Sequence, residues 1–73
     1  MPSRECIILI ILQGDKIIHE EPGCFDIWTF NKNGKTLVTI QNTTTEEDIF
    51  EDLPIKVMST KAPYITIRAE ETS

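Results

Sequence analysis

Cys6–Leu12 is a run of seven consecutive apolar residues near the start of the chain. The run is rich in β-branched side chains and has strand length rather than helix length, so it predicts a β-strand. A strand with two apolar faces is usually covered on both sides. We therefore expect this strand to lie centrally in its sheet with cover above and below, or to lie in an interface between subunits.

The run is too short to be a membrane-spanning helix, which needs about 20 apolar residues. A secretory signal peptide is also disfavoured, because Glu5 follows Arg4 and no small-residue cleavage site is present. The expected location is therefore the cytoplasm, where Cys6 and Cys24 would be reduced and Cys6 would act as a small buried hydrophobe. In a secreted chain the two cysteines could instead pair.

Two turn signals define the first half of the chain. Gly14-Asp15 fits a type II′ hairpin turn and leads into a return strand over Lys16–Glu21, which Pro22-Gly23 should end. Asn33-Gly34 is the strongest hairpin signal, because both central residues of a type I′ turn need positive φ. It is expected to join strands over 24–31 and 35–42, with the pairs Phe30/Leu37, Thr29/Val38 and Ile27/Ile40.

The aromatic residues of this second hairpin alternate in direction with their neighbours. Trp28 and Phe30 share one face of the strand, whereas Phe25 and Ile27 share the other. Core positions are the more common fate of such large side chains. If Phe25 and Ile27 fill the core instead, Trp28 and Phe30 form an outward patch with Leu37, and such a patch usually marks an interface.

The segment 43–54 has the features of a short helix. Thr44 and Glu47 fit a capping box, with Thr45 and Asp48 as a similar alternative. An apolar stripe follows, and a proline ends it; these residues are Ile49, Phe50, Leu53 and Pro54. We expect one to two turns of helix with an acidic outer face.

A last hairpin is expected from Ile55–Ser59 and Tyr64–Ala69, with Ile55, Val57, Ile65 and Ile67 facing inward. The prediction is thus one domain over 1–73 with flexible ends at 1–5 and 70–73. Its class is all-β, or β-rich α+β. The expected architecture is a small antiparallel barrel or sandwich of about six strands in three hairpins, with one short acidic helix between the fourth and fifth strands.

The net charge of −5 is concentrated in one place. The segment 43–54 carries five acids and no base, while the remaining seven acidic and seven basic residues balance. Such a segment repels phosphate and attracts basic surfaces. A solvated helix face is the simplest explanation of it, and a docking surface for a basic partner is the functional one.

No catalytic, metal or cofactor site is predicted. The only histidine, His19, and the two cysteines have the spacing C-x12-H-x4-C, which lacks the close ligand pairs of zinc sites. No third group is indicated to orient a Cys24–His19 nucleophile pair. The many carboxylates lie in segments where nothing would remove them from water, as acid–base catalysis requires.

The sequence therefore predicts a small acidic, non-enzymatic, cytoplasmic protein-binding module. In its sharper form, the hypothesis is an inhibitor or regulator of a nucleic-acid-handling protein, whose basic groove would receive carboxylates in place of phosphates. The expected partner-binding residues lie in the acidic segment and the aromatic hairpin: Glu46, Glu47, Asp48, Glu51, Asp52, Trp28 and Phe30. One alternative is a self-assembling structural subunit, a homo-oligomer. Another is a binder of single-stranded nucleic acid through Trp28 and Phe30, which the overall charge disfavours.

Overall fold

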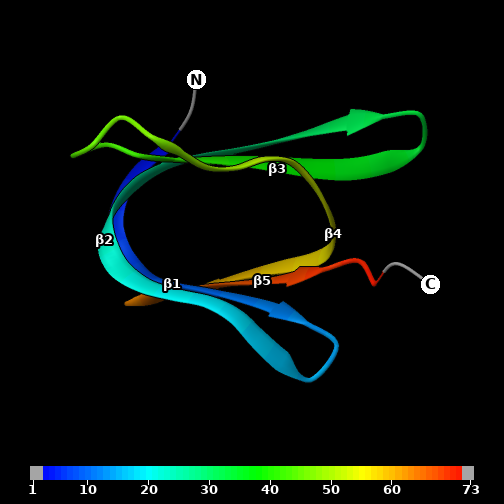
Figure 1. Cartoon of the computed structure of the whole chain (residues 1–73), viewed down its shortest axis with the longest axis horizontal. Helices are drawn as coiled ribbons and strands as arrows, with labels where there is room; N and C mark the ends of the chain where they lie inside the picture. Colours follow the sequence, from blue (N-terminus) through cyan, green and yellow to red (C-terminus); the bar gives the residue numbers. More distant parts are fainter. Residues whose placement is uncertain (1–2, 72–73) are drawn as a thin grey trace.

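The computed structural model describes residues 3–71, and side chains from residue 6 onward. Five strands form one closed sheet, a small barrel in which each strand pairs with its neighbours in chain order (Figure 1). They are β1 (Ser3–Gln13), β2 (Lys16–Lys32), β3 (Lys35–Asn42), β4 (Asp48–Lys61) and β5 (Tyr64–Ala69). The all-β class is confirmed. The expected sixth strand and the short helix are wrong: the described residues contain five strands and no helix.

The count falls to five because β2 is one long strand where two were expected. Pro22 and Gly23 do not end it but pair with Ile8 and Ile7 of β1. A Pro-Gly step is tolerated where a strand bends at a barrel corner, and β2 is strongly curved beside β1 in Figure 1. The bend lets residues 16–27 of β2 pair with β1 and residues 25–32 pair with β3, so that residues 25–27 lie between the two.

Both predicted hairpin turns are present. Gly14 has a φ of 63°, and Asn33 and Gly34 have φ values of 54° and 78°. The β2–β3 register contains the expected pairs Phe30/Leu37, Thr29/Val38 and Ile27/Ile40. In the first hairpin the pairing shifts by one residue between Ile11 and Leu12, so that His19, not Ile18, lies opposite Ile11. Ile18 is the extra residue of a β-bulge.

The predicted helix over 43–54 is replaced by a turn and the start of β4. Phe50 and Leu53 lie opposite Ile40 and Val38 of β3, with irregularities in the ladder on both sides of Ile40. Asp52, with a φ of 54°, is part of one irregularity. Because each extra residue changes the face that follows it, Phe50 and Leu53 both pack on the core. The spacing of Phe50 and Leu53 in the sequence is also that of an apolar stripe on a helix, which is why the segment resembles one.

The barrel closes through a parallel pairing between β1 and β5, which join residues 8–13 to residues 64–69. Its interior holds a contiguous apolar core: Leu9, Ile11, Phe25, Ile27, Val38, Ile40, Ile55, Ile65 and Ile67. Val57, expected inward, is 53% exposed. The register shifts between Ile55 and Val57, which turns Val57 to the outside. At the chain ends, residues 1–2 and 72–73 lie outside the described range, while the Glu70 amide donates to the Pro54 carbonyl at 2.9 Å.

Candidate protein-binding surface

Trp28, Phe30 and Leu37 lie on the outer face of the β2–β3 hairpin. Their neighbours Ile27 and Val38 are buried in the core, and successive side chains of a strand point to opposite faces. Trp28 is 36% exposed, so the expectation that it fills the core is wrong. Leu37 is only 8% exposed although it is on the outside, because Phe30 and Pro54 flank it on the adjacent strands.

Asp52 of β4 lies beside this aromatic face. Thr39, the cross-strand partner of Trp28, is a buried polar residue at 6% exposure. Its hydroxyl accepts a hydrogen bond from the Asp52 amide at 3.2 Å and donates to Asp52 Oδ1 at 3.5 Å. The Asp52 carboxylate and the Trp28 ring therefore lie on either side of Thr39 on the same outer surface of the barrel.

All five carboxylates of the acidic segment are exposed; they belong to Glu46, Glu47, Asp48, Glu51 and Asp52. None of the five forms a salt bridge with another side chain of the described part of the chain. Asp48 starts β4 opposite Gln41, and Pro54 lies opposite Leu37. The acids thus extend from the turn before β4 along that strand to the edge of the aromatic group. We call this set, together with Trp28, Phe30 and Leu37, the aromatic–acidic face.

The turn before β4 is held by Asn42 rather than by a helix cap. The Asn42 Oδ1 atom accepts hydrogen bonds from the amides of Thr44 at 2.8 Å and Thr45 at 3.1 Å. The Asn42 carbonyl accepts from the amide of Glu46 at 2.8 Å, and Glu46 adopts a left-handed φ of 61°. This local competition for backbone amides is typical of Asn at turns. It directs the chain into β4 and fixes the position of the first acids.

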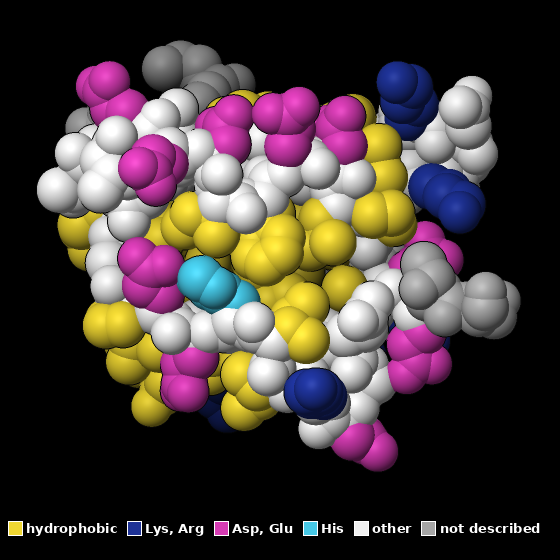
Figure 2. Space-filling model, viewed as in Figure 1, with side chains coloured by type: hydrophobic (Ala, Val, Ile, Leu, Met, Phe, Trp, Pro, Cys, Tyr) yellow, Lys and Arg dark blue, Asp and Glu magenta, His cyan; other side chains and the backbone are white. Residues whose placement is uncertain are grey.

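His19 connects the same turn to the barrel. Its Nε2 atom lies 2.9 Å from Glu21 Oε1, and Asn42 Nδ2 donates to Glu21 Oε2 at 3.2 Å. The rings of His19 and Phe50 also pack in a T-shaped arrangement, with centroids 5.6 Å apart. Figure 2 shows a face of the barrel with apolar side chains at its centre, the histidine at their margin and acidic side chains along much of the border. His19 is therefore a packed, hydrogen-bonded residue of β2.

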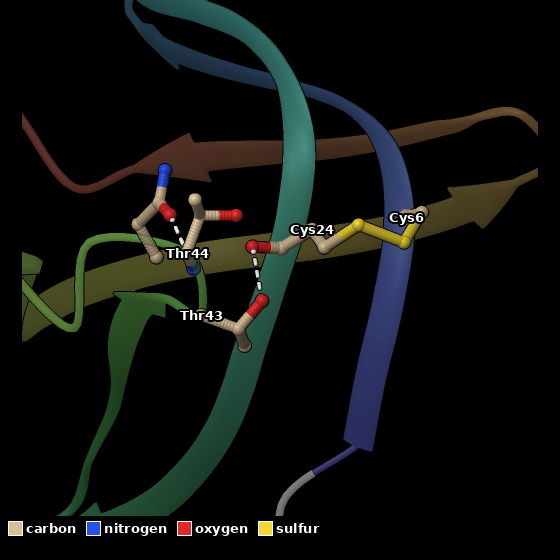
Figure 3. The surroundings of a disulfide bond; sticks show 5 residues. Cys6, Cys24, Thr43 and Thr44 are labelled. Atoms are coloured by element: carbon tan, nitrogen blue, oxygen red, sulfur yellow. Dashed lines mark hydrogen bonds between the residues drawn. A yellow bond between two sulfur atoms is a disulfide. The ribbon is translucent and has the colours of Figure 1, made fainter.

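Cys6 and Cys24 form a disulfide between β1 and β2 (Figure 3). The expectation that Cys6 is a buried free thiol is wrong, since it is an exposed residue of the outer face. The Thr43 hydroxyl and amide both donate to the Cys24 carbonyl at 3.0 Å, which ties the disulfide strand to the acidic turn. The sequence does contain a signal for this pairing. If the first hairpin continues through Pro22-Gly23 with a single bulge, Cys6 lies opposite Cys24.

The remaining site expectations concern metals and membranes. In residues 3–71 no group of three or more His, Cys, Asp or Glu side chains is arranged to hold a metal ion. No helix with the length and apolar character needed to cross a membrane occurs in that range either. Comparison with known proteins finds no matching family model, no matching curated protein and no matching solved structure.

Proposed function

We propose that this protein is a non-enzymatic binding module that docks a basic protein partner on its aromatic–acidic face. The observation that carries the proposal is the position of Trp28 and Asp52 on either side of Thr39. An exposed tryptophan supplies the kind of anchor that dominates binding energy in protein interfaces. Carboxylates next to it supply charge complementarity, which speeds association and selects partners of opposite charge.

The arrangement of charge supports a basic partner in particular. Five exposed carboxylates that form no salt bridge with any other described side chain present a strong negative field at this surface. They follow an extended strand and the turn before it, rather than one side of a helix. In the sharper form of the proposal, this row occupies a basic groove that otherwise receives the phosphates of a nucleic acid, and the protein is an inhibitor or regulator of a nucleic-acid-handling protein.

The test is affinity capture from an extract of the native host, followed by identification of the bound proteins. The test variant is Glu47→Lys/Glu51→Lys. Its matched control is Asp15→Lys/Glu71→Lys, which changes the net charge equally at exposed positions outside the aromatic–acidic face. We expect the wild type and the control to capture basic proteins that the test variant does not capture. Trp28→Ala should lose the same proteins. Identical sets of bound proteins for all four chains would contradict the proposal.

Exposure of Trp28 also favours a second candidate, binding of single-stranded nucleic acid. Lys32 and Lys35 pair at the tip of the same hairpin, and exposed aromatic rings can stack on bases. The carboxylates of Asp52 and Glu51 on the adjacent strand oppose it, since they repel phosphate. Trp28 is the only tryptophan, so its fluorescence reports this binding directly. Quenching by an oligonucleotide at low salt would support the second candidate, and an unchanged spectrum would exclude it.

Two further expectations accompany the proposal. The absence of catalytic activity remains a prediction, according to which the carboxylates bind a partner and take no part in a reaction. A cytoplasmic location also remains a prediction, and the Cys6–Cys24 disulfide is an observation against it, because disulfides persist mainly in oxidising compartments. Counting free thiols in the protein isolated under non-reducing conditions decides the point.

A further inference from the structure

The outer face of β1 is apolar and is not covered by another strand. The inner side chains of the strand, Leu9 and Ile11, are fully buried in the core. The outer ones, Ile8, Ile10 and Leu12, are half-buried. Among the described strands, only the sheet neighbours β2 and β5 approach the backbone of β1 closely. The cover that this strand was expected to have on both sides is therefore present on one side only.

The strand register extends this apolar surface across four strands. Ile8 lies between Pro22 and Tyr64, and Leu12 lies between Ile17 and Arg68. Val57 is the β4 partner of Arg68. The outermost side chains are well exposed, with values of 52% for Ile17, 53% for Val57 and 45% for Tyr64. We call this surface the β1 outer face, and it consists of Ile8, Ile10, Leu12, Ile17, Val57 and Tyr64.

The two borders of the β1 outer face carry opposite charges. On the β2 side, Glu20 is the partner of Ile10. On the β4–β5 side, Lys61 is the partner of Tyr64. Arg68 lies inside the face, between Leu12 and Val57. The Arg68 guanidinium is held in place by a hydrogen bond from Nη1 to the Gly14 carbonyl at 2.6 Å. An apolar centre with one acidic and one basic border is complementary to itself.

We propose that the β1 outer face is a dimer interface that binds a second copy of this chain. In a two-fold dimer the same patch faces itself. A two-fold axis parallel to β1 exchanges the two borders, so that Glu20 of each copy faces the Lys61 border of the other. An axis perpendicular to β1 would place Glu20 against Glu20 and Lys61 against Lys61. The charges therefore select the parallel axis, with the two sheets packed about 10 Å apart.

The size of the face sets the strength of the association. Four strands at their usual spacing and three outward residues along β1 cover a surface of about 20 Å by 20 Å. Two such surfaces bury less than the about 1,200 Å² at which stable interfaces begin, so the dimer is a weak one. We expect half-association at protein concentrations on the order of micromolar to hundreds of micromolar.

Sedimentation equilibrium of the oxidised protein over a range of concentrations tests the proposal. The average mass should rise from that of one chain, 8.3 kDa, toward that of two. Ile8→Glu should keep the protein monomeric, because it places a carboxylate between the uncharged Pro22 and Tyr64 in the apolar centre. Glu20→Lys and Lys61→Glu should each weaken association at least tenfold, since like charges then meet, and combining the two substitutions should restore it. Trp28→Ala, on the aromatic–acidic face, should leave it unchanged.

Two results would overturn the inference. One is a wild-type protein that stays monomeric up to millimolar concentration. The other is a dimer that Ile8→Glu and Glu20→Lys leave intact, which would place the interface elsewhere on the molecule. Circular dichroism of each variant distinguishes a lost interface from a lost fold. The salt dependence of dimerisation gives an independent readout. Screening of the border charges in high salt should weaken the dimer, whereas the contacts of the apolar centre should not be weakened by salt.

Discussion

Thr39 and Asp52 face each other across the β3–β4 ladder, where the threonine hydroxyl both accepts from the Asp52 amide and donates to the Asp52 carboxylate. This pair holds the chain at the point where the ladder is irregular and Asp52 has a positive φ. It therefore keeps a charged, strained residue in a fixed position next to the exposed Trp28.

Replacing Thr39 by valine tests this role. The side chain keeps its shape but loses both hydrogen bonds, which leaves the amide of Asp52 without its partner. We expect the free energy of unfolding to fall by about 1–2 kcal/mol in urea titrations. The control is Thr36→Val on the same strand, where the hydroxyl bonds an exposed Asn31 side chain at 3.0 Å. Equal losses for both variants would show that burial of the Thr39 pair contributes nothing.

Replacing both cysteines, as Cys6→Ser/Cys24→Ser, removes the cross-link between β1 and β2. The disulfide joins residues 18 apart in the sequence, and a loop of similar length is worth about 3 kcal/mol through restriction of the unfolded chain. We expect a loss of that size in thermal or urea unfolding. Dithiothreitol should destabilise the wild type to the same extent and leave the double variant unaffected. A wild type that is insensitive to reductant would be evidence that the thiols are free.

Glu46 occupies a left-handed conformation with a φ of 61°. This conformation is costly for a residue with a Cβ atom and free for glycine. Glu46→Gly should therefore raise the free energy of unfolding by about 0.5–1 kcal/mol, seen as a higher midpoint in thermal melting. The matched control is Glu47→Gly, whose φ is not positive and which should destabilise the protein. If both variants melt below the wild type, the turn does not adopt this conformation in solution.

Asn42→Ala should loosen the acidic turn. It removes the acceptor for the amides of Thr44 and Thr45 and the donor to Glu21. We expect a stability loss of about 1–2 kcal/mol. Amide hydrogen exchange should become faster at Thr44 and Thr45, while exchange in the β2–β3 hairpin stays slow. Unchanged exchange at these two amides would mean that the turn is held by other contacts.

Turn chemistry made part of the fold predictable. Asn33 and Gly34 dictate their own conformation, and the register of Phe30 against Leu37 follows from the turn with no further information. The same holds for Gly14 at the first hairpin. Such signals are local, because the residues that specify the backbone conformation are the residues that adopt it.

Bulges account for most of what could not be predicted. An extra residue at Ile18 moved Ile11 opposite His19, and another before Val57 turned that side chain to the outside. The irregular ladder around Ile40 gave Phe50 and Leu53 the spacing of a helical stripe. Whether a strand bulges depends on how the whole barrel closes, so the sequence around each bulge carries no clear sign of it.

The residues of the candidate site were predicted individually, but their arrangement was not. The acids and Trp28 stand out through charge and size. Their placement on one outer surface depends on the pairing of Trp28 with Thr39 and on the bulge at Asp52. The disulfide is only an alternative in the sequence analysis, because Pro22-Gly23 predicts the end of a strand and so separates Cys24 from the hairpin that contains Cys6.

The parallel pairing of β1 with β5 has a consequence for synthesis of the protein. The first hairpin and its disulfide need only the first part of the chain, whereas the sheet cannot close until residues 64–69 have left the ribosome. Until then the nascent protein has two open strand edges and an accessible apolar interior, a state prone to pairing with other chains. Any delay late in translation would therefore lengthen the period in which chaperones must protect the protein from aggregation.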